Sequence, residues 1–162
     1  MENFSRTINS FRATRLLFAV SMAAVLFLSV APVAAQVPTF IAVIQSGQEV
    51  PPTGSPSFGN GFLTFDLSTR MLCYSISFTN LASAETVAHF HGPAQPGVNA
   101  GILFDISPVP SPSGSPKTGC VGPLSGAQTQ QLFQGLFYIN IHSTGDPGGE
   151  IRGQVLFQAV IP

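Results

Sequence analysis

The chain has 162 residues, of which 44% are hydrophobic and only 8% are charged. Beyond residue 35, six acidic and three basic residues leave a formal charge of −3. No basic patch is present, which argues against nucleic acid as a partner. The length of this part suits one domain.

The first 35 residues have the pattern of a secretory signal peptide. Three arginines precede the uncharged apolar stretch 16–30, and small residues follow at the positions that a signal peptidase reads. We expect cleavage after Ala35, which leaves a secreted or periplasmic domain of residues 36–162 without a further membrane span. The alternative is an uncleaved N-terminal anchor, because 16–35 is about long enough to span a bilayer.

Two cysteines, Cys73 and Cys120, lie in the part that we expect to be exported. An oxidising compartment favours a disulfide between them. The loop would enclose roughly 47 residues and contribute on the order of 4 kcal/mol in the chain-entropy model. The alternative is a pair of separate buried thiols.

The first half of the expected domain is predicted to consist of strands. Phenylalanine, valine, isoleucine and threonine recur in short runs with glycine and proline between them. We predict a strand at 39–45, a turn-rich connection at 47–60, and a hairpin of alternating strands at 62–67 and 71–79.

The second half adds further strands and one helical turn. In chain order these are a strand at 86–91, a short strand at 102–106, a proline-rich surface loop at 107–118, a helical turn at 128–134, and a final hairpin of strands at 136–142 and 150–158. Many short strands at this spacing predict an all-β fold. We expect an antiparallel β-sandwich, of the Ig-like or superoxide-dismutase-like Greek-key type, with one short helical turn.

All three histidines lie near the ends of two predicted strands. His89 and His91 are two residues apart and therefore share one face of their strand, while His142 ends a later strand. Three imidazoles suit Zn²⁺ or Cu²⁺, and Glu150 or Asp105 could add an oxygen ligand or orient a histidine. The alternative is that these histidines only hydrogen-bond backbone or carboxylate groups at the strand ends.

Polar residues also mark one face of the final hairpin. Glu150, Arg152 and Gln154 alternate along one strand, and Asn140 lies on the strand expected to pair with it. We predict structural roles: Asn140 holds the turn of this hairpin, and Arg152 pairs with Glu150 or Asp105. An anionic ligand at Arg152 is the alternative.

Three blocks of the chain resemble the CHRD domain family, which is named from chordin. They are Gly47–Pro52 (GQEVPP), Ala88–Ala94 (AHFHGPA), and Tyr138–His142 (YINIH) followed by Pro147–Gln154 (PGGEIRGQ). The resemblance covers nearly all of 36–162 and implies an extracytoplasmic all-β domain. In animal chordins these repeats belong to a secreted antagonist of bone morphogenetic proteins. That role is not transferred here, because the cysteine-rich modules that accompany the domain in chordin are missing from these 162 residues.

Catalytic motifs are missing from the sequence. It contains no glycine-flanked serine elbow, no phosphate-cradling glycine motif and no obvious carboxylate pair. We therefore expect a non-catalytic binding or surface-structural module with a protein, glycan or matrix ligand, whose three histidines could hold copper or zinc. One alternative is a copper/zinc metalloprotein with redox or metal-carrier activity, and another is self-association through exposed strand edges.

Overall fold

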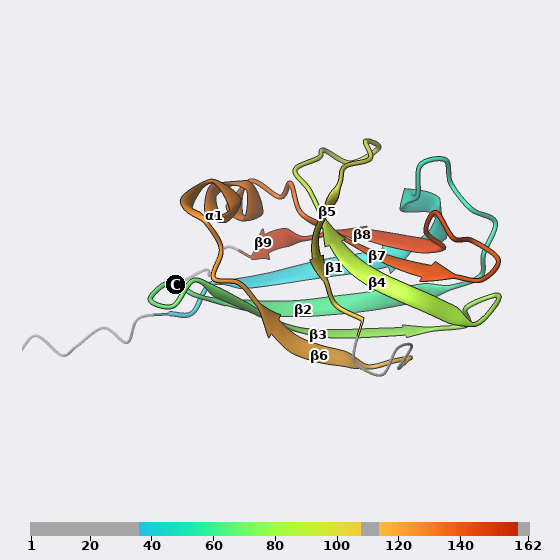
Figure 1. Cartoon of the computed structure of the whole chain (residues 1–162), viewed down its shortest axis with the longest axis horizontal. Helices are drawn as coiled ribbons and strands as arrows, with labels where there is room; N and C mark the ends of the chain where they lie inside the picture. The colour runs from blue at the N-terminus through green and yellow to red at the C-terminus, as the bar shows by residue number, and fades with distance from the viewer. Residues whose placement is uncertain (1–35, 108–113, 159–162) are drawn as a thin grey trace, which may run out of the picture. The chain divides into compact units, whose positions relative to one another are not determined.

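The computed structural model describes residues 36–107 and 114–158 (Figure 1). Its elements in chain order are β1 (Thr39–Gln45), η1 (Ser46–Gln48, a 3-10 helix), β2 (Phe58–Asp66), β3 (Met71–Thr79), β4 (Glu85–His91), β5 (Ile102–Asp105), β6 (Lys117–Val121), α1 (Gly126–Phe133), β7 (Tyr138–Ser143), β8 (Ile151–Gln154) and β9 (Leu156–Gln158). The predicted signal peptide lies outside the described residues. Within those residues, no helix has the length and apolar character needed to cross a membrane.

The described strands form one antiparallel sheet in the order β5-β4-β7-β8-β1-β2-β3-β6, with β9 also paired to β1. The sheet curls until its two ends approach each other. The rings of Tyr74 on β3 and Phe90 on β4 are 5.5 Å apart, and Lys117 on β6 forms a buried ion pair with Glu85 on β4. The all-β antiparallel prediction is confirmed as a nearly closed, barrel-like sheet, and the Greek-key sandwich stays a prediction.

Alternation of apolar residues along the strands builds the interior of the barrel. Phe40, Leu63, Phe65 and Ile139 are all fully buried, because successive side chains of a strand point to opposite faces. The predicted helical turn is α1, which begins two residues earlier than expected at a Ser125 capping box. Its Phe133 ring packs on Phe40 and Phe65, at centroid distances of 5.2 and 6.0 Å.

Strand β2 begins at Phe58, four residues before the predicted start. Gly59 and Gly61, which precede the predicted strand, lie inside β2. A Cβ on Gly61 would lie 2.9 Å from Cδ1 of Ile139, and one on Gly59 would lie 2.6 Å from the carbonyl oxygen of Ser77. Gly59 has no room for a side chain because the backbone of the neighbouring strand approaches it closely, which is a recognised reason for glycine within a strand.

The predicted surface loop ends before residue 118, because strand β6 begins at Lys117. Lys117 and Thr118, expected in the loop, belong to this strand, while residues 108–113 lie outside the described part. Pairing of β6 with β3 places Cys73 directly opposite Cys120, and the two form a disulfide across a sequence separation of 47. The predicted disulfide is therefore confirmed.

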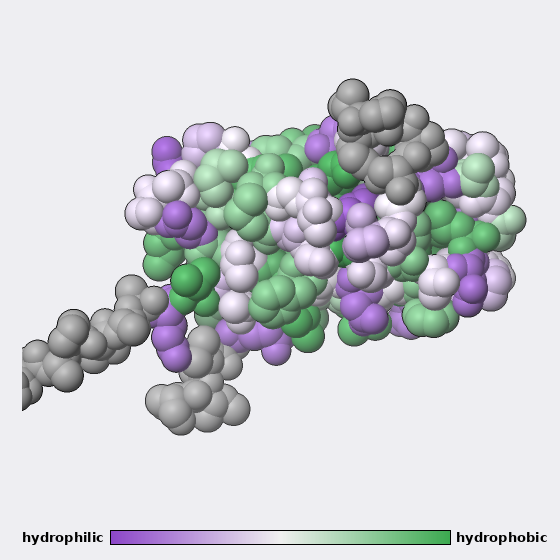
Figure 2. Space-filling view, turned by 90° about the horizontal axis from the view of Figure 1, so that it is seen from below, coloured by the Kyte–Doolittle hydropathy of each residue, from purple (hydrophilic) through white to green (hydrophobic). Residues whose placement is uncertain are grey.

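Apolar side chains also occur on the outer surface of the sheet. Ile41, Phe62 and Leu156 lie opposite one another on three neighbouring strands and are 38%, 54% and 50% exposed. On the face seen in Figure 2, hydrophobic residues are interspersed with hydrophilic ones. Self-association of the protein stays a prediction.

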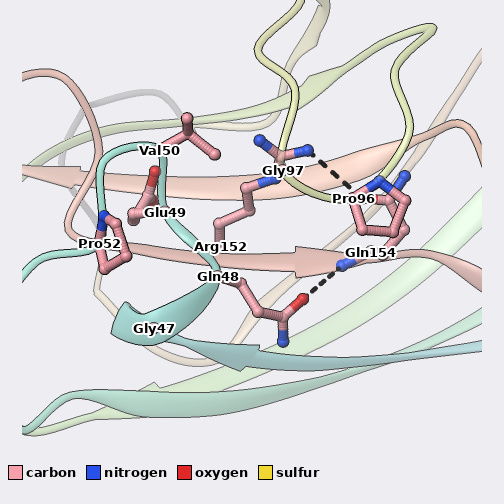
Figure 3. A pocket seen from close by; sticks show the side chains of 9 residues that line it. All are labelled: Gly47, Gln48, Glu49, Val50, Pro52, Pro96, Gly97, Arg152 and Gln154. Atoms are coloured by element: carbon pink, nitrogen blue, oxygen red, sulfur yellow. Dashed lines mark hydrogen bonds between the residues drawn. The ribbon is translucent and has the colours of Figure 1, made fainter.

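The polar face of β4, β7 and β8 is covered by loops. We call its outward-facing residues the covered polar face: His89, His91, Tyr138, Asn140, His142, Arg152 and Gln154. All of them except His89 are buried, although they point away from the core. The turn η1 and the loop with Pro96 and Gly97 lie against β8 (Figure 3). The hairpin turn 144–150 adds further cover, since His142 hydrogen-bonds to Pro147.

Candidate metal centre

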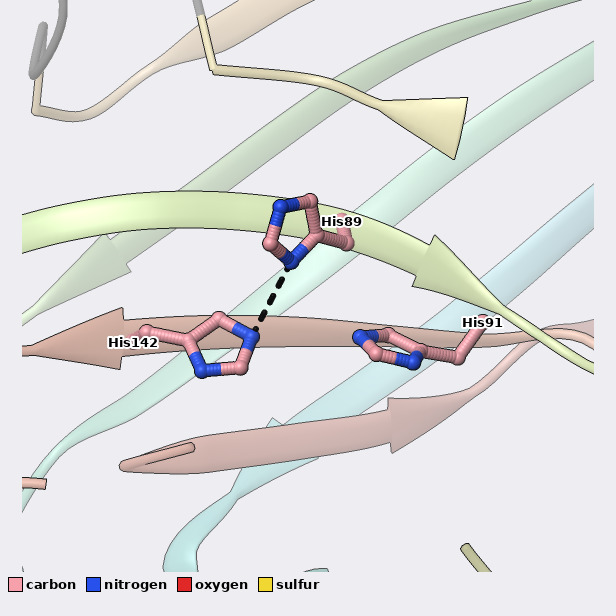
Figure 4. Close-up of side chains that lie close together, drawn as sticks. All are labelled: His89, His91 and His142. Carbon is pink, nitrogen blue, oxygen red and sulfur yellow. Dashed lines mark hydrogen bonds between the residues drawn. The ribbon is translucent and has the colours of Figure 1, made fainter. Parts of the chain in front are cut away.

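The structure brings the three histidines together on the covered polar face (Figure 4). Strands β4 and β7 pair so that His89 lies opposite Asn140, and Val87 opposite His142. One ring nitrogen from each histidine lies within 4.8 Å of the other two. The closest pair is Nδ1 of His89 and Nε2 of His142, at 3.2 Å.

Backbone carbonyls determine which nitrogen is free in two of the rings. Nδ1 of His91 is 3.0 Å from the carbonyl oxygen of Ala100, and Nδ1 of His142 is 3.0 Å from that of Pro147. A carbonyl oxygen only accepts, so each Nδ1 donates a proton and each neutral ring keeps its lone pair on Nε2. Hydrogen bonds of this kind orient the histidine ligands of metal sites.

Nε2 of His91 is the most informative atom of the group. It is buried and has no hydrogen-bond partner among the residues that the structure describes. Figure 4 shows this nitrogen pointing toward the rings of His89 and His142. Leaving a buried polar atom without a partner typically costs about 1–3 kcal/mol.

The distance between the closest nitrogens fits a shared ion. Zinc binds imidazole nitrogen at about 2.0–2.1 Å, so two such ligands at a tetrahedral angle lie about 3.3 Å apart. The observed separation of 3.2 Å between His89 and His142 matches this value. Without a metal ion, Nδ1 of His89 can instead donate a proton to the lone pair of His142.

The electrostatic environment keeps the three rings in the neutral form that binds metal. Burial is the main cause that lowers the pKa of each of the three histidines. For His89, the neighbouring His142 and His91 lower the pKa further, while Asp105 raises it. Asp105 lies opposite His89 in the pairing of β4 with β5, so this carboxylate acts on the site from the adjacent strand.

His91 stacks on Tyr138, which in turn stacks on Arg152. The His91 ring lies on that of Tyr138 with centroids 5.0 Å apart and an interplanar angle of 9°. The guanidinium carbon of Arg152 lies 3.5 Å from the centroid of the same tyrosine ring. The role of Tyr138 was not predicted, although alternation along β7 puts it on the same face as Asn140 and His142.

The structure corrects the expectation that Glu150 assists the histidines. Oε1 of Glu150 accepts hydrogen bonds from Ser55, Ser57 and the backbone of Ala82, so Glu150 is not among the histidines. These donors come from outside the histidine group and hold the carboxylate of Glu150 away from it.

Arg152 pairs with neither Glu150 nor Asp105. Its polar contacts are to Asn99, Gln95 and Gln154, because loop 92–101 folds over β8 and supplies acceptors from distant sequence. Gln154 is itself anchored, since its side-chain amide donates to Ala94 and Gly135.

Asn140 lies against the turn that it was expected to hold. A Cβ on Gly149 would lie 2.5 Å from both side-chain polar atoms of Asn140 and 2.7 Å from Oε1 of Glu49. Only glycine fits this approach, and Gly149 also has a φ of +130°. Glu49, which was not predicted as a site residue, therefore reaches the same face from the segment after η1.

The comparisons with known proteins add one finding. The family model of the CHRD domain matches residues 40–155, a range that includes the three histidines, the disulfide and the covered polar face. No curated protein and no solved structure matches the chain.

Proposed function

The chain belongs to the CHRD domain family, and on this premise we propose that it is a non-catalytic, extracytoplasmic module that binds one divalent metal ion, copper or zinc. His89, His91 and His142 are the proposed ligands. The Cys73–Cys120 disulfide supports the location outside the cytoplasm, because disulfides persist in oxidising compartments.

The observation that carries the metal proposal is the convergence of three imidazoles whose free nitrogens have no better partner. The Nε2 atom of His91 is buried without a hydrogen bond among the described residues. The Pro147 carbonyl holds the lone pair of His142 on Nε2, which contacts Nδ1 of His89 at 3.2 Å. A bound ion would satisfy all three rings at once. Imidazole is a suitable ligand for both copper and zinc, and His89 is partly exposed, which provides an entry path.

The test is metal analysis of the protein after periplasmic expression, followed by calorimetric titration of the metal-free protein with Zn²⁺ and Cu²⁺. We expect one ion per chain and at least a tenfold loss of affinity in His91→Ala and His142→Ala. Asp66→Asn is the control, since Asp66 is an exposed carboxylate at the end of β2. Sub-stoichiometric copper and zinc, with equal binding by wild type and the histidine variants, would reject the site.

A further inference from the structure

A cavity lies on the covered polar face beside the histidine group, and the metal proposal does not use it. Its volume is about 410 Å³. The turn of η1 with Glu49 and Val50 forms one wall, the loop at Pro96 forms another, and Arg152 of β8 forms the floor (Figure 3).

Arg152 is a buried cation in this cavity without an anionic partner. It is 1% exposed, and no carboxylate oxygen of the described residues lies within 4.0 Å of its guanidinium. Its acceptors are neutral: the side chain of Asn99 at 3.2 Å, that of Gln154 at 3.4 Å and the carbonyl oxygen of Gln95 at 3.5 Å. The two longer contacts are weak, so donor capacity remains on a guanidinium whose charge is stabilised by stacking on Tyr138 but by no described carboxylate within 4.0 Å.

Glu49 lines the same cavity and attracts Arg152, but the two side chains form no ion pair within 4.0 Å. It is 5% exposed, and its Oε1 has no hydrogen-bond partner in the described part of the chain. Burial raises the pKa of Glu49 to about 7, against the opposing effect of Arg152. Near neutral pH much of Glu49 is therefore an uncharged carboxyl group that can donate a hydrogen bond.

We propose that this cavity binds a small carboxylate ligand. The planar guanidinium of Arg152 matches the two oxygens of a carboxylate. Val50, Pro52 and Pro96 supply an apolar wall for the hydrocarbon part of the ligand. A metal cation would be repelled by Arg152, and a neutral ligand would leave the buried charge uncompensated.

The test uses sodium butyrate as the probe and metal-free protein, so that a carboxylate cannot bind through an ion on the histidines. Binding is followed by NMR shifts of the backbone amides of Gly47, Gln48 and Gly97. We expect saturable shifts with butyrate, and at least tenfold weaker binding of 1-butanol and butylamine. Equal binding of butyrate and butanol would overturn the proposal, whatever the outcome of the metal titration.

Three variants locate the binding site. Arg152→Lys should weaken butyrate binding at least tenfold, because a lysine cannot form the bidentate contact. Pro96→Trp fills the cavity from an exposed position without changing the core, and it should abolish the shifts even if Arg152→Lys does not fold. Val98→Trp is its control, since Val98 is 53% exposed in the same loop but does not line the cavity. Unchanged butyrate binding by Pro96→Trp refutes this location.

Discussion

Replacing Glu49 by glutamine should change how the stability of the protein depends on pH. Burial raises the pKa of Glu49 from 4.5 to about 7, so the folded state holds its proton at pH values where the unfolded state has released it. Stability falls as pH rises wherever the native state binds more protons. The wild type should therefore lose stability between pH 4.5 and 7, and Glu49→Gln should lack this loss.

The size of the effect follows from the pKa change. One pKa unit corresponds to about 1.4 kcal/mol, so the rise from 4.5 to about 7 corresponds to at most about 3 kcal/mol. The charges that face Glu49 are Arg152, which lowers its pKa, and Asp146, which raises it, and both remain in the variant. The free energy of unfolding of Glu49→Gln relative to wild type should increase by up to about 3 kcal/mol from pH 4.5 to pH 8.

The histidines titrate with the opposite sign and must be separated from this effect. Their lowered pKa values mean that the unfolded state takes up protons first, so stability is lost as pH falls below about 6.5. This contribution is the same in both proteins and cancels in the difference between them. Urea unfolding in carboxylate-free buffers from pH 4.5 to 8 measures the difference directly. A difference that stays constant across this range would refute a raised pKa for Glu49.

Two further predictions concern stability. The free energy of unfolding of the double variant with Cys73→Ser and Cys120→Ser should be lower by on the order of 4 kcal/mol, because the disulfide closes a loop across a sequence separation of 47. Urea unfolding measures this loss. A 2 Da mass change on reduction of the wild type confirms the bond. Lys117→Met should destabilise the protein by about 3–5 kcal/mol because it leaves Glu85 buried and unpaired. Adding Glu85→Gln should restore part of that loss, and a double-mutant cycle without coupling between the two positions would contradict the ion pair.

Strand periodicity predicted the parts of the fold that depend on local sequence. The bounds of β1 and β3 match the predicted 39–45 and 71–79. β3 alternates between apolar and polar residues, and β1 is a short apolar run bounded by polar residues. Strand β6 was missed because it is an edge strand formed by pairing with β3, with Gly119 at its centre. Pairing with a distant strand leaves no local pattern to read.

The grouping of the three histidines was predictable from the sequence, but the orientation of their rings was not. The two-residue spacing of His89 and His91 placed them on one face, and the pairing of β4 with β7 brings His142 to them. The carbonyl groups of Ala100 and Pro147, which set the free nitrogens, come from irregular loops. A backbone carbonyl carries no signal in the amino-acid sequence, so the orientation of the rings needed the structure.

The covered polar face also shows where the residues that carry the family resemblance meet. The first block supplies Glu49, the second supplies His89 and His91, and the third supplies His142 and Arg152. Contacts between the blocks span long separations, such as the hydrogen bond from the backbone of Gln154 to the side chain of Gln48, 106 residues away. The apolar core needs only alternating hydrophobic residues of suitable size, whereas this face requires specific polar side chains. The three blocks that carry the family resemblance therefore meet on the covered polar face, whereas none of them supplies the exposed apolar side chains of β1 and β2.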